Sequence, residues 1–220
     1  MVHCETPSGT LNGLKELARA IKSEGKLLIV DAVSSIGGVE IDVKWGGVDI
    51  LIGGSQKVLN LPSGLTILAV SDEAWEAWRE SITGGFYLNI RLWRDVMEKM
   101  EFPYTHSEPL INGLLESLKI IREEGLNNVY MRHRAVAQGV VRAVEAMNLK
   151  LVPESEVFSS PTVTAFYVPN GLSDIKVIET ARRYGVFIAG SWGGPLKGKV
   201  LRIGHMGGYT ASLNIMANAS

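Results

Sequence analysis

Two side chains in this sequence have types and positions that could do chemistry together. Asp31 ends the apolar run "LLIVD", and Lys57 follows the apolar run at residues 48–52 and the glycines Gly53 and Gly54. A lysine just beyond a buried strand is ordinarily solvated and has no catalytic role. Whether Lys57 is an exception depends on the elements that place it near other reactive groups.

The elements around these residues alternate between helix and strand. Apolar residues at helical spacing predict a helix over residues 14–23. Uninterrupted apolar runs predict strands at "KLLIVD", at residues 48–52 and at residues 65–71, each covered on both faces. The alternation predicts an α/β domain with a largely parallel sheet.

Open parallel sheets bind ligands just beyond the carboxyl ends of their strands. Asp31 and Lys57 both follow predicted strands, and Thr6 follows the strand-like stretch at the start of the chain. A lysine and an acid brought together in this way suit pyridoxal phosphate. The lysine forms a Schiff base with the cofactor's aldehyde, and the acid keeps the pyridine nitrogen protonated.

The pattern changes after "FPYTHSEP". Helices are predicted over residues 109–123 and 129–147, followed by a strand at 162–168, a helix at 173–184, a short strand at 187–189 and a strand at 200–203. We therefore expect the remainder of a large domain at residues 1–107 and a smaller α+β domain at residues 108–220. Both ends look truncated, because the chain starts inside a strand-like stretch and "YTASLNIMANAS" has helical spacing without a cap.

Composition narrows the class of protein. The chain has 220 residues, a formal net charge of −1 and 46% hydrophobic residues. Near-neutral charge without a long basic run argues against a nucleic-acid partner. No apolar stretch approaches the roughly 20 residues that span a bilayer, so we expect no membrane association. The single cysteine, Cys4, fits a reducing compartment, and we expect a cytoplasmic protein.

The stretch "DAVSSIGGVEIDVKWGGVDILIGGSQKVLNLPSG" resembles the cofactor-lysine region of the class V, fold type I aminotransferases. "HCETPSG", "FPYTHSEP" and "GKVLRIGHMG" extend the resemblance over essentially the whole chain, and the branch it is most similar to is alanine–glyoxylate or serine–pyruvate aminotransferase. The resemblance implies amino-group transfer between a small amino acid and a 2-oxo acid by a homodimer. The family's Gly-rich phosphate turn and ring-stacking aromatic residue have no counterpart here.

The resemblance also implies roles for individual residues. Lys57 is the catalytic Schiff-base lysine, and Asp31 is the catalytic partner of the pyridine nitrogen. The other implied cofactor contacts are Val33 on one ring face, Thr6 beside the phenolic oxygen, Gln56 at the phosphate, and Tyr104 and Ser107 at the phosphate of the partner subunit. Arg202 is the implied anchor of the substrate carboxylate, since its planar fork suits bidentate binding.

Three of these residues also have a purely structural interpretation. Asp31 could cap a helix or be solvated at a strand end, Thr6 could be a turn residue, and Arg202 could be an ion-pair partner. The four histidines are too scattered for a metal site, so no metal is expected. The tryptophans Trp75, Trp78 and Trp93 are expected in packing or at an interface.

Three functions remain open from the sequence. The first is the transaminase that the resemblance implies. The second is a lyase or desulfurase of the same fold, although Cys4 is expected to be an inert buried thiol on the cofactor side. The third is a non-catalytic remnant that at most dimerises with related chains.

Overall fold

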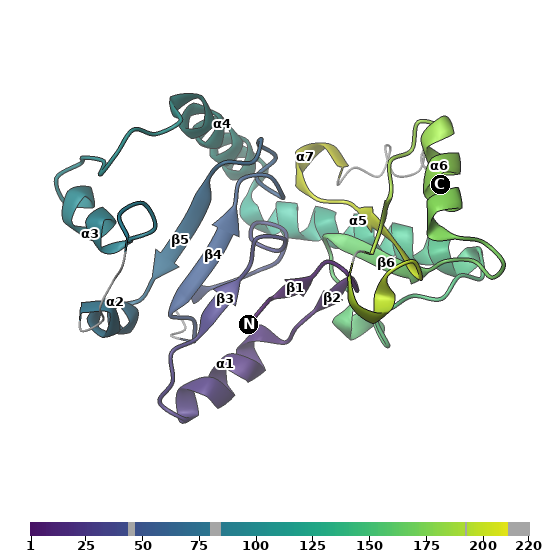
Figure 1. Cartoon of the computed structure of the whole chain (residues 1–220), viewed down its shortest axis with the longest axis horizontal. Helices are drawn as coiled ribbons and strands as arrows, with labels where there is room; N and C mark the ends of the chain where they lie inside the picture. The colour runs from purple at the N-terminus through teal and green to yellow at the C-terminus, as the bar shows by residue number, and fades with distance from the viewer. Residues whose placement is uncertain (44–46, 80–84, 192, 211–220) are drawn as a thin grey trace.

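The structure is a computed structural model and describes residues 1–43, 47–79, 85–191 and 193–210. Within these residues the strands form a small hairpin and two larger sheets, with strand orders β3-β4-β5 and β6-β8-β7. The hairpin of β1 and β2 lies between the two larger sheets (Figure 1). The molecule therefore has a junction in its middle to which the first residues of the chain contribute.

The N-terminal elements are β1 (Cys4–Glu5), β2 (Thr10–Leu11), α1 (Leu14–Ser23), β3 (Ile29–Asp31), β4 (Ile50–Gly54), β5 (Thr66–Val70), α2 (Asp72–Arg79) and α3 (Arg91–Met97). The C-terminal elements are α4 (Glu108–Glu124), α5 (Leu126–Ala146), η2 (Glu156–Phe158), β6 (Val163–Tyr167), α6 (Asp174–Arg183), β7 (Ala189–Gly190), η3 (Gly194–Leu196), β8 (Val200–Gly204) and α7 (Gly207–Thr210). The helices and strands predicted with both bounds are all found, each within about three residues of its predicted limits. Of the pattern noted at "YTASLNIMANAS", residues 211–220 lie outside the described residues.

The sheet β3-β4-β5 is mixed, whereas the apolar runs predict a largely parallel one. Asp31 lies opposite Ile52 in the parallel pair of β3 and β4, and β5 then runs antiparallel to β4. A parallel return needs a crossover of about a dozen or more residues, usually a helix, and the link at residues 55–65 contains none. On the other edge of β3, Val2 forms a parallel bridge with Asp31, so the first residues of the chain extend the parallel pairing.

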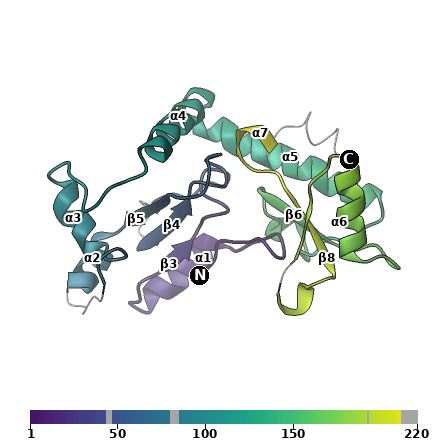
Figure 2. The same cartoon turned by 45° about the horizontal axis from the view of Figure 1, so that its top comes forward.

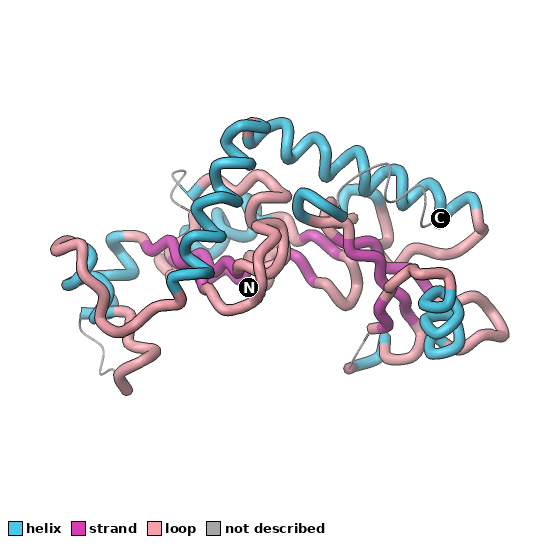
Figure 3. The backbone as a smooth tube through the Cα atoms, turned by 90° about the horizontal axis from the view of Figure 1, so that it is seen from above, coloured by secondary structure: helices cyan, strands magenta, loops and turns pink. Residues whose placement is uncertain are grey.

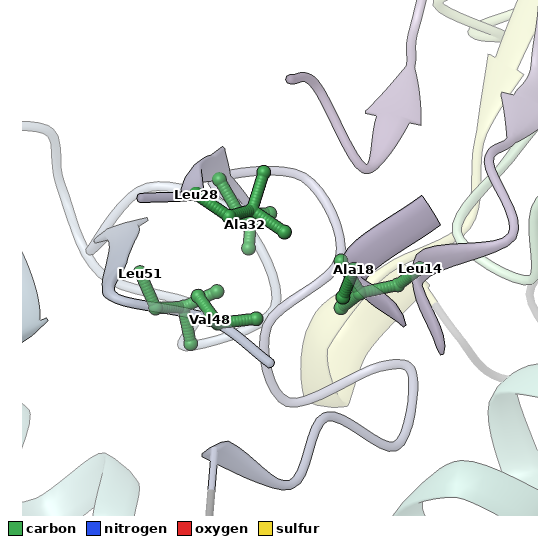
Figure 4. Packing of buried hydrophobic residues seen from close by; sticks show 7 residues of the cluster. Leu14, Ala18, Leu28, Ala32, Val48 and Leu51 are labelled. Carbon is green, nitrogen blue, oxygen red and sulfur yellow. The ribbon is translucent and has the colours of Figure 1, made fainter. Parts of the chain in front are cut away.

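The core of this half lies between α1 and one face of the sheet. Leu14 and Ala18 of α1 lie on its side toward the sheet residues (Figure 4). The buried cluster consists of Leu14, Ala18, Leu28, Val30, Ala32, Val48 and Leu51. On the opposite face Ile29 and Leu68 stay 49% and 40% exposed. The prediction that these strands are covered on both faces is therefore wrong for the described residues, because a uniformly apolar run does not encode which of its faces is covered.

Buried Asp49 bonds to three segments of this half: α1, the residue just before β3 and the link between β5 and α2. Its carboxylate accepts hydrogen bonds from Lys22 Nζ at 2.8 Å, from the Leu28 backbone N–H at 2.7 Å and from Ser71 Oγ at 3.0 Å. Burial raises the pKa of Asp49, but the hydrogen bonds from Lys22, Leu28 and Ser71 outweigh it and the net pKa is lowered. The ionised carboxylate is therefore the form that the fold stabilises.

Replacing Asp49 with alanine should lower the free energy of unfolding by about 2–4 kcal/mol, because the buried Leu28 N–H loses its acceptor and Lys22 loses its partner. Urea denaturation of the full-length protein at neutral pH measures this. Asp72→Asn, an exposed change in the first turn of α2, is the control and should cost less than about 1 kcal/mol. Equal losses in the two variants would contradict the role given to Asp49.

The second large sheet packs against α5 and α6. β8 lies between β6 and β7 and is antiparallel to both, with Val144, Phe166 and Leu201 at the centre of the core. α4 and α5 meet at Gly125, whose φ of 85° allows the sharp change of direction visible in Figure 3. α4 itself contacts the first half, since Ser117 Oγ donates to the Leu59 carbonyl at 2.6 Å. The domain division at residues 107 and 108 stays a prediction.

Three of the four histidines are buried and hydrogen-bonded. His205 donates from Nδ1 to the Pro161 carbonyl at 3.1 Å, so its Nε2 accepts from Thr164 Oγ1 at 2.8 Å. His133 donates to the Val129 carbonyl at 2.7 Å and accepts from the Gly207 N–H at 3.1 Å. His3 lies 3.0 Å from Ser35 Oγ. The Gly207 N–H requires an unprotonated Nε2, so the His133 ring is neutral, and burial lowers the pKa of all three rings.

Stability should fall between about pH 6.5 and pH 4. Burial lowers the pKa of His205 and of His3 to about 4, against about 6.5 in the unfolded chain. The unfolded state then binds more protons than the folded state, so the stability present above pH 6.5 is lost as the pH falls. Each group contributes at most about 3 kcal/mol. Urea midpoints measured at several pH values should show a flatter pH dependence for His205→Gln, and superimposable curves would contradict the prediction.

Candidate active site

Asp31 and Lys57 lie beyond the carboxyl ends of the adjacent parallel strands β3 and β4. Asp31 is the last residue of β3 and pairs with Ile52, and Lys57 lies in the turn at residues 55–59 that follows β4. Asp31 is exposed and Lys57 is half-buried. The topology therefore brings the acid and the lysine to the same edge of the sheet, as the sequence predicts.

The backbone of Asp31 is bonded to the first residues of the chain along one edge of β3. Its N–H donates to the Met1 carbonyl and its carbonyl accepts from the His3 N–H, both at 2.8 Å. Its Oδ1 accepts from the Val33 N–H at 3.0 Å, which closes a tight turn after the strand. The exposed carboxylate is thus held at a defined position at the strand end.

Val33 and Gln56 lie beside the glycine that ends β4. A Cβ added to Gly54 would come within 2.9 Å of Gln56 Oε1 and within 3.1 Å of Val33 Cγ1. The absence of a side chain at Gly54 therefore lets both side chains approach the backbone next to Lys57. The structure brings together Asp31, Val33, Gln56 and Lys57.

The turn that carries Lys57 is stabilised by its own hydrogen bonds. Buried Ser55 donates from Oγ to the Pro62 carbonyl at 2.8 Å and accepts from the Leu65 N–H at 3.2 Å. The Asn60 N–H donates to the Lys57 carbonyl at 2.9 Å. These bonds limit the positions that the Lys57 backbone can adopt.

Thr6 lies in the turn between β1 and β2, next to buried Cys4. Burial raises the pKa of the Cys4 thiol, while its hydrogen-bond contacts with Ser160 and Thr162 lower it, as does the positive charge of Lys57. The net pKa is raised, so the thiol stays protonated.

Arg202 reaches the same hairpin from the second sheet. It lies in β8 opposite Ala165 and Ala189. Its Nε and Nη2 donate to the Gly190 carbonyl at 3.0 and 2.8 Å, and its Nη1 donates to the Thr6 carbonyl at 3.5 Å. Burial lowers the pKa of Arg202, but a guanidinium remains protonated at any physiological pH. Figure 2 shows the N-terminal segment extending from β3 toward β6 and β8.

Tyr104 and Ser107 lie in a different part of the chain. They belong to the segment between α3 and α4, on the far side of β5 from the hairpin (Figure 1). Tyr104 accepts from Trp93 Nε1 at 3.1 Å and donates to the Tyr87 carbonyl at 3.1 Å. Its ring stacks on that of Tyr87 with centroids 4.9 Å apart. The structure does not bring Tyr104 or Ser107 to Lys57 within this chain.

The sequence prediction missed several buried hydroxyl groups near the site. Thr162 donates to the Ser34 carbonyl, and Ser160 lies 3.1 Å from Cys4 Sγ. Ser191, next to β7, is buried and its Oγ has no hydrogen-bond partner among the described atoms. The polar run "SSPTVT" beside an apolar strand was the only available signal for the first two.

The residues at the sheet edge fit pyridoxal phosphate. The donor set combines an exposed carboxylate, a half-buried amine, a hydroxyl residue and an amide, and the missing Cβ of Gly54 lets the Val33 and Gln56 side chains lie close to the end of β4. Among the described residues no three His, Cys, Asp or Glu side chains gather as metal ligands. No described helix has the length and apolar character that a membrane crossing requires.

Comparisons with known proteins agree with this arrangement. A sequence profile described as "Aminotransferase class-V" matches residues 1–194. The serine–glyoxylate aminotransferase of Methylorubrum extorquens is 39% identical over 219 residues, which cover 94% of this chain and 53% of that protein. The pyridoxamine–pyruvate transaminase of Mesorhizobium japonicum is 37% identical over 209 residues, which cover 93% of this chain and 53% of that protein. The chain spans about half the length of the curated relatives that it matches.

A solved structure shows the same fold. The crystal structure of pyridoxamine–pyruvate aminotransferase from Mesorhizobium loti matches with a TM-score of 0.92 and 36% identity, over 100% of this chain and 56% of that chain. The fold class predicted from the sequence, part of a fold type I large domain followed by a smaller α+β part, is confirmed. Proteins of this family depend on pyridoxal phosphate. Because the profile matches most of the sequence, the chain belongs to the class V aminotransferases.

Proposed function

We propose that this chain forms the lysine-bearing part of a transaminase that moves an amino group from a small amino acid, of alanine or serine type, to glyoxylate or pyruvate. The observation that carries the proposal is the hydrogen bond from Arg202 to the Thr6 carbonyl. This hydrogen bond supports the proposal because it joins a cation that can bind a carboxylate to the hairpin, and the first residues of the chain pair with Asp31 of β3. The printed names of the relatives, serine–glyoxylate and pyridoxamine–pyruvate transaminases, support these substrate classes.

The proposed roles follow from the chemistry of each group. When bound, pyridoxal phosphate supplies an electron sink for the bonds around the substrate's α-carbon. Lys57 would provide the amine that attaches the cofactor covalently, and once the substrate's amino group has displaced it, the freed amine would move a proton to and from the α-carbon. Asp31 holds a proton at the ring nitrogen. Its exposed carboxylate at the strand end is available for that contact.

The neighbouring residues orient the cofactor and the substrate. Val33 would pack on one ring face and Gln56 would contact the phosphate; both side chains lie against Gly54. The hydroxyl of Thr6 lies beside the phenolic oxygen. Arg202 binds the substrate carboxylate in bidentate fashion, which fixes the α-carbon relative to Lys57.

We also propose a homodimer in which Tyr104 and Ser107 contact the cofactor phosphate of the partner subunit. Their placement away from Lys57 in this chain supports such a division of labour. The aromatic side chains around Tyr104 include Phe86 and Tyr87, which are 61% and 70% exposed. Sedimentation of the full-length protein at micromolar concentration should give a dimer, and a fully active monomer would contradict this assignment.

Two other functions are weaker. A desulfurase needs a reactive cysteine, but Cys4 is 3% exposed and its pKa is raised, so its thiol is a poor nucleophile. A non-catalytic remnant would not need an exposed acid and a half-buried lysine beyond adjacent strands. The transaminase is therefore the function that the site supports best.

The test uses the full-length protein purified with pyridoxal phosphate. The transaminase predicts a visible absorbance band from lysine-bound cofactor, and formation of glycine from glyoxylate when serine or alanine is the donor. Sulfide release from cysteine without glycine formation would identify a desulfurase. A protein with neither a visible band nor glycine formation would be a remnant.

A further inference from the structure

We propose that Thr162 is a positioning residue for Asp31, an assignment whose catalytic meaning rests on the proposed function. Thr162 Oγ1 donates a hydrogen bond of 2.7 Å to the carbonyl of Ser34, a residue 128 positions away in the sequence. Both residues are buried. Ser34 lies in the turn that directly follows Asp31, so the second half of the chain holds the segment that carries the acid.

The direction of this hydrogen bond is fixed by chemistry. A carbonyl only accepts, so the single hydroxyl hydrogen of Thr162 is used on Ser34. Thr162 Oγ1 can then only accept from the Ser160 hydroxyl at 3.0 Å and from the Cys4 thiol at 3.7 Å. The Thr162 N–H in turn donates to Ser160 Oγ at 3.1 Å. These groups form a polarised chain in which each bond strengthens the next.

The methyl group of Thr162 contacts the other end of the same turn. A Cβ added to Gly38 would come within 2.6 Å of Thr162 Cγ2, so the Gly38 backbone packs directly on this methyl. Within the turn, the N–H groups of Ser35 and Ile36 both donate to the Ala32 carbonyl, at 3.0 and 2.8 Å. Thr162 thus holds the turn at Ser34 by its hydroxyl and at Gly38 by its methyl.

The position of Thr162 next to the second sheet explains why these two contacts matter for the reaction. Thr162 immediately precedes β6, and Ala165 of β6 lies opposite Arg202 of β8. Asp31 and Arg202 would act on the same bound molecule, from two different sheets. Catalytic groups must keep their mutual placement within fractions of an ångström. The Thr162 hydroxyl therefore provides a direct hydrogen bond between the turn after Asp31 and the segment that leads into the sheet of Arg202.

The kinetic test compares three variants of the full-length enzyme. Thr162→Val keeps the shape but leaves the Ser34 carbonyl without its donor, so kcat should fall about 5- to 30-fold with little change in KM. Thr162→Ser keeps the hydroxyl and should restore kcat to within about 3-fold of wild type. Thr164→Val is the matched control, because Thr164 is also buried and bonds to His205 instead. It should lower kcat by less than about 3-fold.

A second measurement needs neither cofactor nor activity. Backbone hydrogen exchange in peptides covering residues 32–39 should be faster in Thr162→Val than in wild type and unchanged in Thr164→Val. If the valine variant does not fold, Thr162→Ala replaces it. Unchanged exchange in this turn, or equal acceleration in the control, would overturn the positioning role. A wild-type protein without transaminase activity would overturn the proposed function, while the exchange result would still decide whether Thr162 holds the turn.

Discussion

Replacing Lys57 with alanine should abolish both the visible band of the bound cofactor and amino-group transfer. Lys57 is the half-buried amine beyond β4, and under the proposed function its loss removes the covalent attachment and the group that moves the α-proton. Proton transfer by a positioned side chain alone contributes about 10²- to 10⁴-fold, so turnover should fall by at least roughly 1,000-fold. Single-turnover kinetics and absorbance spectra of the full-length protein measure the two losses separately.

The fold should survive this change. The described residues make no hydrogen bond with the Lys57 side chain, and the turn is stabilised by the hydrogen bonds of Ser55 and of the Asn60 N–H. The urea midpoint of Lys57→Ala should therefore stay close to that of wild type. Lys15→Ala, on the exposed side of α1, is the matched control and should retain the band and full turnover. Near-normal transamination by Lys57→Ala would show that another group attaches the cofactor.

Replacing Arg202 with alanine should lower kcat/KM for amino-acid and oxo-acid substrates by roughly 30-fold to several thousandfold. Truncating one partner of a desolvated arginine–carboxylate pair costs about 2–5 kcal/mol, at about 1.4 kcal/mol for each factor of ten. Arg202→Lys should recover only part of the loss, because an ammonium cannot reproduce the planar fork. Cofactor affinity, measured by titrating the visible band, should barely change.

An amine without a carboxylate distinguishes anchoring from folding. Arg202 also donates to the Gly190 and Thr6 carbonyls, so its removal could loosen the contact between β7 and the hairpin. If the guanidinium anchors the substrate, the slow reaction of the carboxylate-free amine should be insensitive to Arg202→Ala. Equal losses with both types of substrate would mean that Arg202 holds the two sheets together and is not the anchor.

The sequence by itself determined the elements whose signals are local. Helical spacing and a following glycine gave α1 its bounds, and apolar runs located β4, β5, β6 and β8. These signals depend on neighbours a few residues apart, which is why they can be recognised without the fold. Family-like residues in sequence order also located Asp31 and Lys57 at strand ends, where parallel pairing of β3 and β4 brings them to one edge.

A strand-like stretch was predicted at the start of the chain, but its pairing into a hairpin was not. The hairpin of β1 and β2 has only two residues in each strand, and Thr10 pairs across to Ser159 while the Ser160 N–H donates to the Gly9 carbonyl. Pairing partners so distant in sequence stabilise strands that would be unstable alone. The antiparallel direction of β5 and the open face with Ile29 and Leu68 likewise depend on how the chain returns and on which face α1 covers.

The contacts that assemble the candidate site were decided by the tertiary structure alone. Arg202 meets the Thr6 carbonyl across 196 residues, and Thr162 meets the Ser34 carbonyl across 128. In both contacts the acceptor is a backbone carbonyl, a group that every residue possesses, so no residue type at position 6 or 34 marks it in the sequence. The side-chain types in the sequence indicated which residues could react. Which of these residues are held together was determined by the packing of the two sheets on the N-terminal hairpin.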